Sequence, residues 1–344
     1  MIDNFKAYVV REGKNGVFSG QIETKKFDDL PPNEITIKVK YSSLNYKDAL
    51  SSIGNKGVTK KYPHTPGIDA AGIVVSSKSK KFSINDKVIV TGYDLGMNTS
   101  GGFSEYVSVP TEWVVRLPEA ISLKYAMAIG TAGLTAVLCI DLLNKNCGIK
   151  NNQAIVTGST GGVGSVTIQL LSKLGAQITA VTGKSDSNEF LSEIGANTIL
   201  TRDELVEKFR HPLSKGIYDI GVDVVGGEVL SGLLTCLKRN GAIACCGNVG
   251  GPDFSTSVFP FILRGNRLLG VDSAERSLDQ KESLWEKISD DWMLKDIEKY
   301  CKIIGLNDIG FELRKIYDGK QTGRVIVAPN VDQLGNRCKI LQQN

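Results

Sequence analysis

The chain lacks the features of a membrane or secreted protein. None of the hydrophobic runs in its 344 residues approaches the roughly eighteen apolar residues of a membrane span. Its first residues, Met1–Lys6, have no apolar segment behind a basic start, so no secretory signal is predicted. Seven cysteines are scattered without paired spacing, which favours reduced thiols over a disulfide framework. These absences predict a soluble, cytoplasmic protein without a membrane partner.

A strong charge of either sign is also missing. The 41 Lys and Arg residues are interspersed with 37 Asp and Glu residues, and the net charge is +4. No basic patch is indicated, so the sequence predicts no nucleic-acid partner, while small anionic ligands remain open. The length exceeds the roughly 250–300 residues at which one hydrophobic core stops growing, which favours two domains.

Two different patterns of apolar and polar residues, one in each half of the chain, support this division. Up to Val115, short apolar alternations broken by Gly and Pro, such as 35–39 and 87–90, predict a compact β-rich domain built as a barrel or folded sheet. After Pro118, strands and helices alternate, beginning with an apolar helical run over 126–143. Alternation with short connections predicts a parallel, doubly wound sheet, so the fold class is α/β.

The later elements can be placed from the same patterns. Helices are predicted to end at Gly175 and Gly195, because glycine commonly terminates a helix. Residues 279–304 read mostly as helix, and residues 323–327 read as a strand that returns to the first domain. The predicted strands of the second domain are 153–156, 177–182, 217–225, 242–247 and 267–271.

A glycine cluster follows the first strand of the second domain and opens a helix. Gly158, Gly161 and Gly164 stand where free backbone N–H groups and the positive end of the helix dipole can face a pyrophosphate. The spacing is not the standard G-x-G-x-x-G, and the alternative is a plain tight turn. The surrounding strand–helix–strand pattern favours a dinucleotide site.

The end of the second strand predicts which dinucleotide is bound. NAD-binding proteins place an acid there to hold the ribose 2′-hydroxyl, whereas this chain has Thr182, Gly183 and Lys184. A lysine attracts the 2′-phosphate that an acid would repel, so NADPH is favoured over NADH. Asp186 weakens this argument, and a solvated Lys184 is the alternative interpretation.

With these pieces in place, the chain resembles the medium-chain dehydrogenase/reductase superfamily over essentially its whole length. Within it, the chain is similar to the YhdH/YhfP group of quinone oxidoreductase-like proteins, which includes reductases similar to acryloyl-CoA reductase. The shared stretches are 43–50 (SLNYKDAL), 66–72 (PGIDAAG), 130–133 (GTAG), 260–265 (PFILRG) and 270–273 (GVDS).

The resemblance implies a domain plan and an assembly. It implies a GroES-like catalytic domain over 1–122, completed by about 294–330, and a Rossmann NADPH-binding domain over 123–293. It also implies a homodimer. The chemistry it implies is zinc-independent, NADPH-dependent reduction of a small-molecule substrate.

The residues of the superfamily's catalytic zinc site are missing. No cysteine precedes Cys139, and the histidines are His64 and His211 only. Where the zinc-dependent members carry Gly-His-Glu, this chain has Gly67, Ile68 and Asp69. We therefore predict no metal, so Lewis-acid activation of an alcohol or carbonyl is not expected.

Candidate site residues come from the glycine motif and the resemblance together. Catalytic roles are predicted for Tyr46, Asn45 and Asp48. Tyr46 is expected first as a nicotinamide contact, with plain packing as the alternative, and the proton donor is open between its phenol and water. Asn45 and Asp48 have local loop bonding as their alternative. The predicted cofactor contacts are Tyr46, Thr131, Ser159, Thr160, Gly161, Gly162, Val163, Gly164, Thr182, Gly183, Lys184, Arg202, Gly247, Asn248, Ile262, Ser273 and Arg324.

Three functions remain open at this point. A metal-free nicotinamide site can deliver hydride to a carbon made electron-poor by conjugation, and an enoyl-CoA thioester such as acryloyl-CoA is the leading substrate. A quinone is the alternative within the same enzyme class. An NADPH-binding protein without turnover is the third, because a fold does not guarantee activity. For a thioester, the pairs Lys60–Lys61 and Lys80–Lys81 are candidate phosphate anchors or simply solubilising.

Overall fold

The computed structural model of the chain describes residues 3–330 and divides into two compact units. The first unit holds residues up to Thr131, then 274–290 and 295–330, and the second holds 132–273 and 291–294. The chain thus crosses between units at Thr131 and Ser273, which differs from the expected boundaries at 122 and 293. The first crossing directly follows Gly130, a residue with non-helical backbone (φ 53°, ψ −163°) at which the helical stretch 123–147 bends, so no loop in the sequence marks it.

The first unit is rich in β structure, as the alternating patterns predict. Its strands are β1 (Asn4–Glu12), β2 (Phe18–Lys26), β3 (Ile35–Ser43), β4 (Asp69–Ser77), β5 (Lys87–Thr91), β6 (Tyr106–Val109), β7 (Val114–Arg116), β14 (Cys301–Ile304) and β15 (Arg324–Val327). Its helices are α1 (Tyr46–Ser52), α8 (Leu278–Ser289), α9 (Ile309–Tyr317) and the start of α2 (Leu123–Cys147), with the short 3-10 helices Phe27–Asp29, Thr111–Trp113, Ile297–Tyr300 and Leu306–Asp308.

One mixed sheet organises this unit. Its strand order is β14-β15-β3-β4-β5-β7, with β6 also paired to β3, and β1 pairs with β2 separately. Side chains along β3 alternate between buried and half-buried, because one face packs against an apolar core that includes Ile35, Ile37 and Val88. β15 pairs antiparallel with β3, which confirms that the strand predicted at 323–327 returns to this unit.

The second unit alternates strands and helices. Its strands are β8 (Gln153–Thr157), β9 (Gln177–Thr182), β10 (Thr198–Thr201), β11 (Tyr218–Asp223), β12 (Leu237–Cys245) and β13 (Arg267–Gly270). Its helices are the rest of α2, α3 (Gly162–Lys173), α4 (Asn188–Glu193), α5 (Arg202–Lys208), α6 (Gly227–Thr235) and α7 (Phe259–Arg264).

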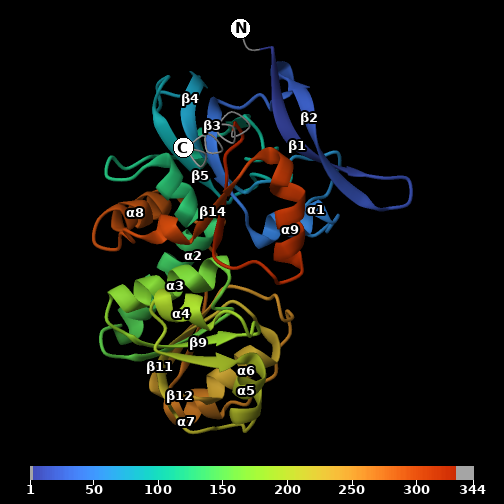
Figure 1. The fold of residues 1–344 in the computed structure, drawn as a ribbon. Coiled ribbons are helices and arrows are strands. Elements are labelled where there is room, and N and C mark those ends of the chain that lie inside the picture. The colour runs from blue at the N-terminus through green and yellow to red at the C-terminus, as the bar shows by residue number, and fades with distance from the viewer. Residues whose placement is uncertain (1–2, 331–344) are drawn as a thin grey trace, which may run out of the picture. The chain divides into compact units, whose positions relative to one another are not determined.

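The strands of this unit form the predicted parallel sheet in the order β10-β9-β8-β11-β12-β13. This order is that of a doubly wound dinucleotide-binding fold, which confirms the fold class. Figure 1 shows α3 and α4 on one face of the sheet and α5, α6 and α7 on the other. The second of these faces covers a core that includes Leu205, Leu233 and Ile243.

Two expectations about helices require correction. Residues 279–304 are not one helix: α8 ends at Ser289, and 301–304 form β14, because these residues pair in parallel with β15. In addition, α2 contains an 18-residue window with a mean hydropathy of 1.9, so an apolar run of spanning length does exist. That window is 89% buried within the protein, as in the core helix of a globular fold.

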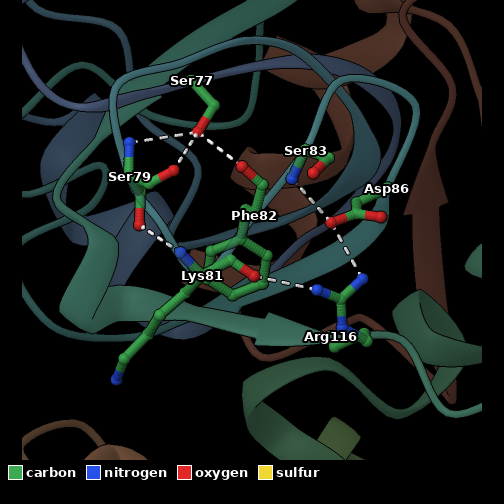
Figure 2. Close-up of polar contacts among 7 residues, drawn as sticks. All are labelled: Ser77, Ser79, Lys81, Phe82, Ser83, Asp86 and Arg116. Atoms are coloured by element: carbon green, nitrogen blue, oxygen red, sulfur yellow. Dashed lines mark hydrogen bonds and ion pairs between the residues drawn. The ribbon is translucent and has the colours of Figure 1, made fainter.

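The loop between β4 and β5 carries the Lys80–Lys81 pair. Its backbone is held from within: the Ser77 hydroxyl donates to the Phe82 carbonyl (2.7 Å), and Arg116 both donates to the Lys81 carbonyl (2.9 Å) and pairs with Asp86 (2.8 Å). Figure 2 shows the Lys81 side chain pointing away from this network. The contacts explain the loop's shape without a ligand, so they do not support a phosphate anchor there.

Candidate active site and cofactor site

The carboxyl ends of the parallel strands lie at one edge of the second unit's sheet. At the end of β8, Gly158 has a φ of +56°, and a Cβ there would lie 2.3 Å from the Val224 side chain. A Cβ on Gly164 would lie 2.3 Å from the Gly158 carbonyl oxygen. Only glycine fits these two positions, and their closeness brings the start of α3 against the strand end.

This arrangement exposes a phosphate-binding helix start. Gly161 is the N-cap of α3, so the first N–H groups of the helix, from Gly162 onward, have no partner inside it. Thr160 lies directly before the cap and is 5% exposed. Ser159 is different, because its hydroxyl donates to the Val156 carbonyl (2.8 Å) and accepts from the Val181 N–H (2.9 Å). We assign the Ser159 side chain to the fold rather than to the cofactor.

Two cations flank the end of β9. Lys184 is half-buried, and burial lowers the pKa of its ammonium group. Arg202 begins α5, and its guanidinium lies within 3.3 Å of where a Gly183 side chain would start. Thr182 accepts the Lys184 N–H through its hydroxyl (3.0 Å), which shapes the turn. Thr182, Gly183, Lys184 and Arg202 are therefore brought together, as the sequence predicts.

A cavity of about 460 Å³ lies beside Arg202. Its lining includes Val206 on α5, Val229 on α6 and the glycine turns at Gly226 and Gly250. It lies between α5 and the start of α6, beyond the carboxyl ends of the strands, a position suited to a purine ring carried by a nucleotide bound at those strand ends.

The turn after β11 depends on a carboxylate that sequence reasoning missed. Asp223 is fully buried; it accepts from the Thr157 hydroxyl (2.7 Å) and from the Gly226 N–H (2.8 Å). Burial raises the pKa of this carboxyl group. Asp223 thereby ties the ends of β8 and β11 together and shapes the cavity edge.

The remaining predicted contacts in this unit fall into two groups. Gly247 and the exposed Asn248 follow β12, and Ser273 follows β13, where its hydroxyl shares a 2.6 Å hydrogen bond with Thr135. These three lie beyond the carboxyl ends of their strands. Ile262 does not: it lies on α7, is 69% exposed, and precedes Arg264, whose guanidinium binds carbonyls at the amino ends of β11 and β12. The contacts within this unit therefore give no support to Ile262 as a cofactor contact, which stays a prediction from the resemblance.

The first unit holds a separate polar cluster around α1. Asn45 is the N-cap of α1, and its backbone N–H donates to Asp48 (2.8 Å). Asp48 is fully buried and also accepts from the N–H groups of Gly67 and Ile68, both at 3.0 Å. Burial, together with the charge of Asp69, raises the pKa of Asp48 to about 7. Asp48 bonds only backbone, so we reassign it from catalysis to positioning α1.

Asp69 lies at the centre of this cluster, and no role was predicted for it from the sequence. Its carboxylate is fully buried and accepts from Ser43 Oγ (2.5 Å), Asn45 Nδ2 (2.8 Å), and both the N–H (2.9 Å) and the hydroxyl (2.6 Å) of Thr131. The donors already occupy the oxygens that a metal ion would need. Thr131 is thus bound to Asp69, which leaves its predicted cofactor contact without support from the geometry.

Arg324 completes the cluster. It is 3% exposed and donates to the carbonyls of Ala128 (3.0 Å) and Leu44 (3.1 Å) and to Ser43 Oγ (2.8 Å). Burial lowers the pKa of the guanidinium, opposed by the charge of Asp69. With its donors used in this way, Arg324 is not placed to bind a phosphate, and we withdraw it as a cofactor contact.

Tyr46 differs from its neighbours because its hydroxyl makes no hydrogen bond within residues 3–330. It is half-buried at the first position of α1, whose first turn is capped by Asn45 and Asp48. Of the three residues predicted to be catalytic, Tyr46 therefore has a polar group still available to a ligand.

The contact of His64 agrees with a structural role, and no metal-binding group involves the histidines or cysteines among residues 3–330. His64 is 6% exposed, and its Nε2 lies 2.9 Å from the Gly96 carbonyl oxygen. Across the part of the chain that the structure describes, no three His, Cys, Asp or Glu side chains are grouped to hold a metal ion. The six cysteines in that part are free thiols, and Cys338 lies outside the described residues.

Two protein families match the chain, in the same order as the two units. The alcohol dehydrogenase GroES-like domain matches residues 31–119, and the zinc-binding dehydrogenase family matches residues 162–290. These matches confirm a GroES-like domain followed by a Rossmann-type domain.

Individual relatives cover nearly the whole chain. YhfP of Bacillus subtilis, named as a quinone oxidoreductase, is 39% identical over 90% of this chain and 94% of its own; its crystal structure with NAD has a TM-score of 0.91. The acrylyl-CoA reductase AcuI of Ruegeria pomeroyi is 37% identical over 95% of this chain and 99% of its own. The crystal structure of Escherichia coli YhdH with NADPH is 36% identical over 94% of this chain and 100% of its own, with a TM-score of 0.90. The chain therefore belongs to the medium-chain dehydrogenase/reductase superfamily, in its quinone oxidoreductase-like YhdH/YhfP group.

Proposed function

We propose that this protein is an NADPH-dependent reductase that transfers a hydride to an activated carbon–carbon double bond, with an enoyl-CoA thioester such as acryloyl-CoA as substrate. The observation that carries the proposal is the likeness to AcuI, named as an acrylyl-CoA reductase, over 99% of that protein's length. The quinone alternative is favoured by a separate observation, the name of YhfP.

The residues of the second unit fit the proposed cofactor. The α3 start supplies unpaired N–H groups for the pyrophosphate, and the cavity beside Arg202 has room for the adenine. Lys184 and Arg202 supply positive charge for the 2′-phosphate, and no acid occupies the end of β9. When bound, NADPH supplies the hydride.

The first unit supplies the groups for the substrate. We propose that Tyr46 contacts the nicotinamide and donates a hydrogen bond to the substrate oxygen that gains negative charge, because its hydroxyl is unused within the described residues. Asn45 and Asp48 hold α1 at its first turn and so fix where Tyr46 begins. A pH profile of the Tyr46→Phe variant distinguishes proton delivery by Tyr46 from proton delivery by water.

The first test is NADPH oxidation with acryloyl-CoA, measured beside the same assay with a simple benzoquinone. Saturable turnover with acryloyl-CoA far above benzoquinone supports the thioester reductase, and the reverse order moves the assignment to quinone reductase. Binding of NADPH without oxidation by either acceptor would contradict both and support a binding protein without turnover.

Cofactor preference has its own test. Arg202→Gln is expected to raise the KM for NADPH about tenfold and to leave the KM for NADH nearly unchanged, because it removes a charge-assisted bond to the 2′-phosphate alone. Arg210→Gln is the matched control, since Arg210 is paired with Glu207 on an exposed helix end. Equal effects on NADPH and NADH would refute the proposed role of Arg202.

We also propose a cytoplasmic homodimer. Supporting the dimer, Val258, Phe259, Ile262 and Leu263 are 44–69% exposed on and beside α7, next to β13 at the edge of the sheet. An exposed apolar patch beside an open strand edge is typical of an association surface. Light scattering tests this: the wild type should have the mass of a dimer, and Ile262→Lys should shift it toward the monomer. A monomeric wild type would contradict the proposal.

A further inference from the structure

A second cavity lies at the amino ends of the parallel strands, whereas the glycine motif lies at their carboxyl ends. Its volume is about 380 Å³, and its lining includes Asn152 before β8, Asp219 at the start of β11, Arg239 on β12 and Arg267 at the start of β13. These positions belong to the amino ends of the strands, so the cavity is separate from the proposed cofactor site.

A bulge in β12 builds one wall of this cavity. Leu237 pairs with Tyr218 and Ala242 pairs with Ile220, so the residues between Leu237 and Ala242 bulge out of the ladder. Asn240, at the tip, has a φ of +63° and offers its carbonyl oxygen to Arg267 (3.3 Å). The bulge carries Arg239 toward the cavity, and such irregularities often serve to aim a side chain.

The charges of the cavity are unbalanced. The Asp219 carboxylate is already used, because it pairs with Lys238 (2.8 Å) and accepts from the Gln153 N–H (2.9 Å). Among residues 3–330, Arg239 makes no hydrogen bond or ion pair, and the half-buried Arg267 uses only Nη1. Two guanidinium groups on one small cavity repel each other unless an anion lies between them.

We propose that this cavity is a binding site for a phosphate group, free or carried by a small metabolite. Each arginine presents a planar set of N–H donors that matches phosphate oxygens, and together they supply two positive charges for a dianion. The proposal does not depend on the enzyme activity, because none of these residues belongs to the proposed cofactor or substrate site.

Cys147 provides a local reporter for the test. Its half-buried thiol lines the cavity, and Arg267 Nη1 lies 3.9 Å from its sulfur. Burial raises the pKa of this thiol, and the charge of Arg267 lowers it. A phosphate on Arg267 both covers the thiol and cancels part of that charge, so it slows alkylation of Cys147.

The experiment measures alkylation of the full-length protein by iodoacetamide, peptide by peptide, while inorganic phosphate is titrated at constant ionic strength. We expect saturable protection of Cys147 and none of Cys301, which lies in the other unit. Arg239→Gln and Arg267→Gln should each need about tenfold more phosphate for half protection. Arg210→Gln should match the wild type, and so should Arg202→Gln, which separates this site from the proposed cofactor site.

A parallel titration with glycerol 3-phosphate distinguishes the two sources of the phosphate group. Tighter protection than by inorganic phosphate assigns the site to a phosphate monoester, and weaker protection assigns it to free phosphate. The proposal is overturned if phosphate leaves Cys147 unprotected, or if protection has the same midpoint in both arginine variants as in the wild type.

Discussion

Replacing Asp69 by Asn should destabilise the first unit by about 3 kcal/mol. The amide keeps one acceptor oxygen for Ser43, Asn45 and the Thr131 N–H, and the Thr131 hydroxyl can reverse its role. The main loss is therefore the negative charge near the buried Arg324. Removing one partner of a buried ion pair costs about 3–5 kcal/mol. The lower end applies because Arg324 reaches Asp69 through Ser43 and not directly.

Urea unfolding followed by tryptophan fluorescence can isolate this unit. Trp113 and Trp285 belong to the first unit and Trp292 to the second, so the experiment uses a Trp292→Phe background. With an m value of about 3 kcal/mol per molar, the midpoint should fall by about 1 M. The slope should not change, because the same surface is exposed on unfolding.

Asp86→Asn is the matched control. Asp86 is also a carboxylate paired with an arginine in the first unit, but the Arg116 side chain is 55% exposed. An exposed ion pair contributes about 0–1 kcal/mol, so the midpoint should hardly move. Equal shifts for the two variants would show that the charge of Asp69 does not stabilise Arg324, and the reasoning would fail.

Three further variants probe other buried positions. The folded-state pKa of Asp48, about 7, lies above its ordinary value of 3.8, so between these values the native state holds a proton that the unfolded chain releases, and stability is lost as pH rises. The difference in unfolding free energy between wild type and Asp48→Asn should therefore shrink from pH 3.8 to about 7 and stay level above it. A difference that grows with pH would contradict this. Lys281→Met should lower the free energy of unfolding in urea by about 2–4 kcal/mol, because the fully buried ammonium donates to two carbonyls (2.6 and 2.8 Å) and lies 3.2 Å from the centroid of the Tyr93 ring. A loss below about 1 kcal/mol would show that these contacts do not stabilise the fold. Gly130→Ala should cost about 3 kcal/mol more than Gly16→Ala, since both have positive φ but only the Gly130 Cβ would lie within 2.6 Å of polar atoms, and equal melting temperatures would contradict this.

Local patterns explain what could be predicted from the sequence. The glycine motif, the alternating strands and the acid-free end of β9 each depend on residues close together in the chain, so periodicity and spacing reveal them. Right-handed crossovers then limit the sheet order to few choices, and the parallel sheet follows. The same reasoning placed Thr182, Gly183 and Lys184 at one strand end, whereas Arg202 was expected near the cofactor's phosphates from the family resemblance alone.

The Asp69 cluster could not be predicted in this way. Its hydrogen bonds join Ser43 to Arg324 across 281 residues, and no local pattern links them. Ser159 shows the converse case: a hydroxyl beside a glycine motif suggests a ligand contact, but tertiary packing uses this hydroxyl to join β8 to β9. The Ile262 prediction rests on a shared motif, and a motif alone gives no information on which end of the strands a residue lies near.

The cost of the Asp69 cluster suggests its purpose. Burying two carboxylates and a guanidinium is expensive, and well-packed apolar replacements of buried ion pairs are often neutral or stabilising. Stability alone therefore does not account for the cluster. What apolar side chains cannot do is fix directions: Asp69 orients Asn45 at the start of α1, and Arg324 binds the backbone beside the Gly130 bend in α2. Since Tyr46 follows Asn45 directly, we infer that the cluster is retained to fix the position of Tyr46.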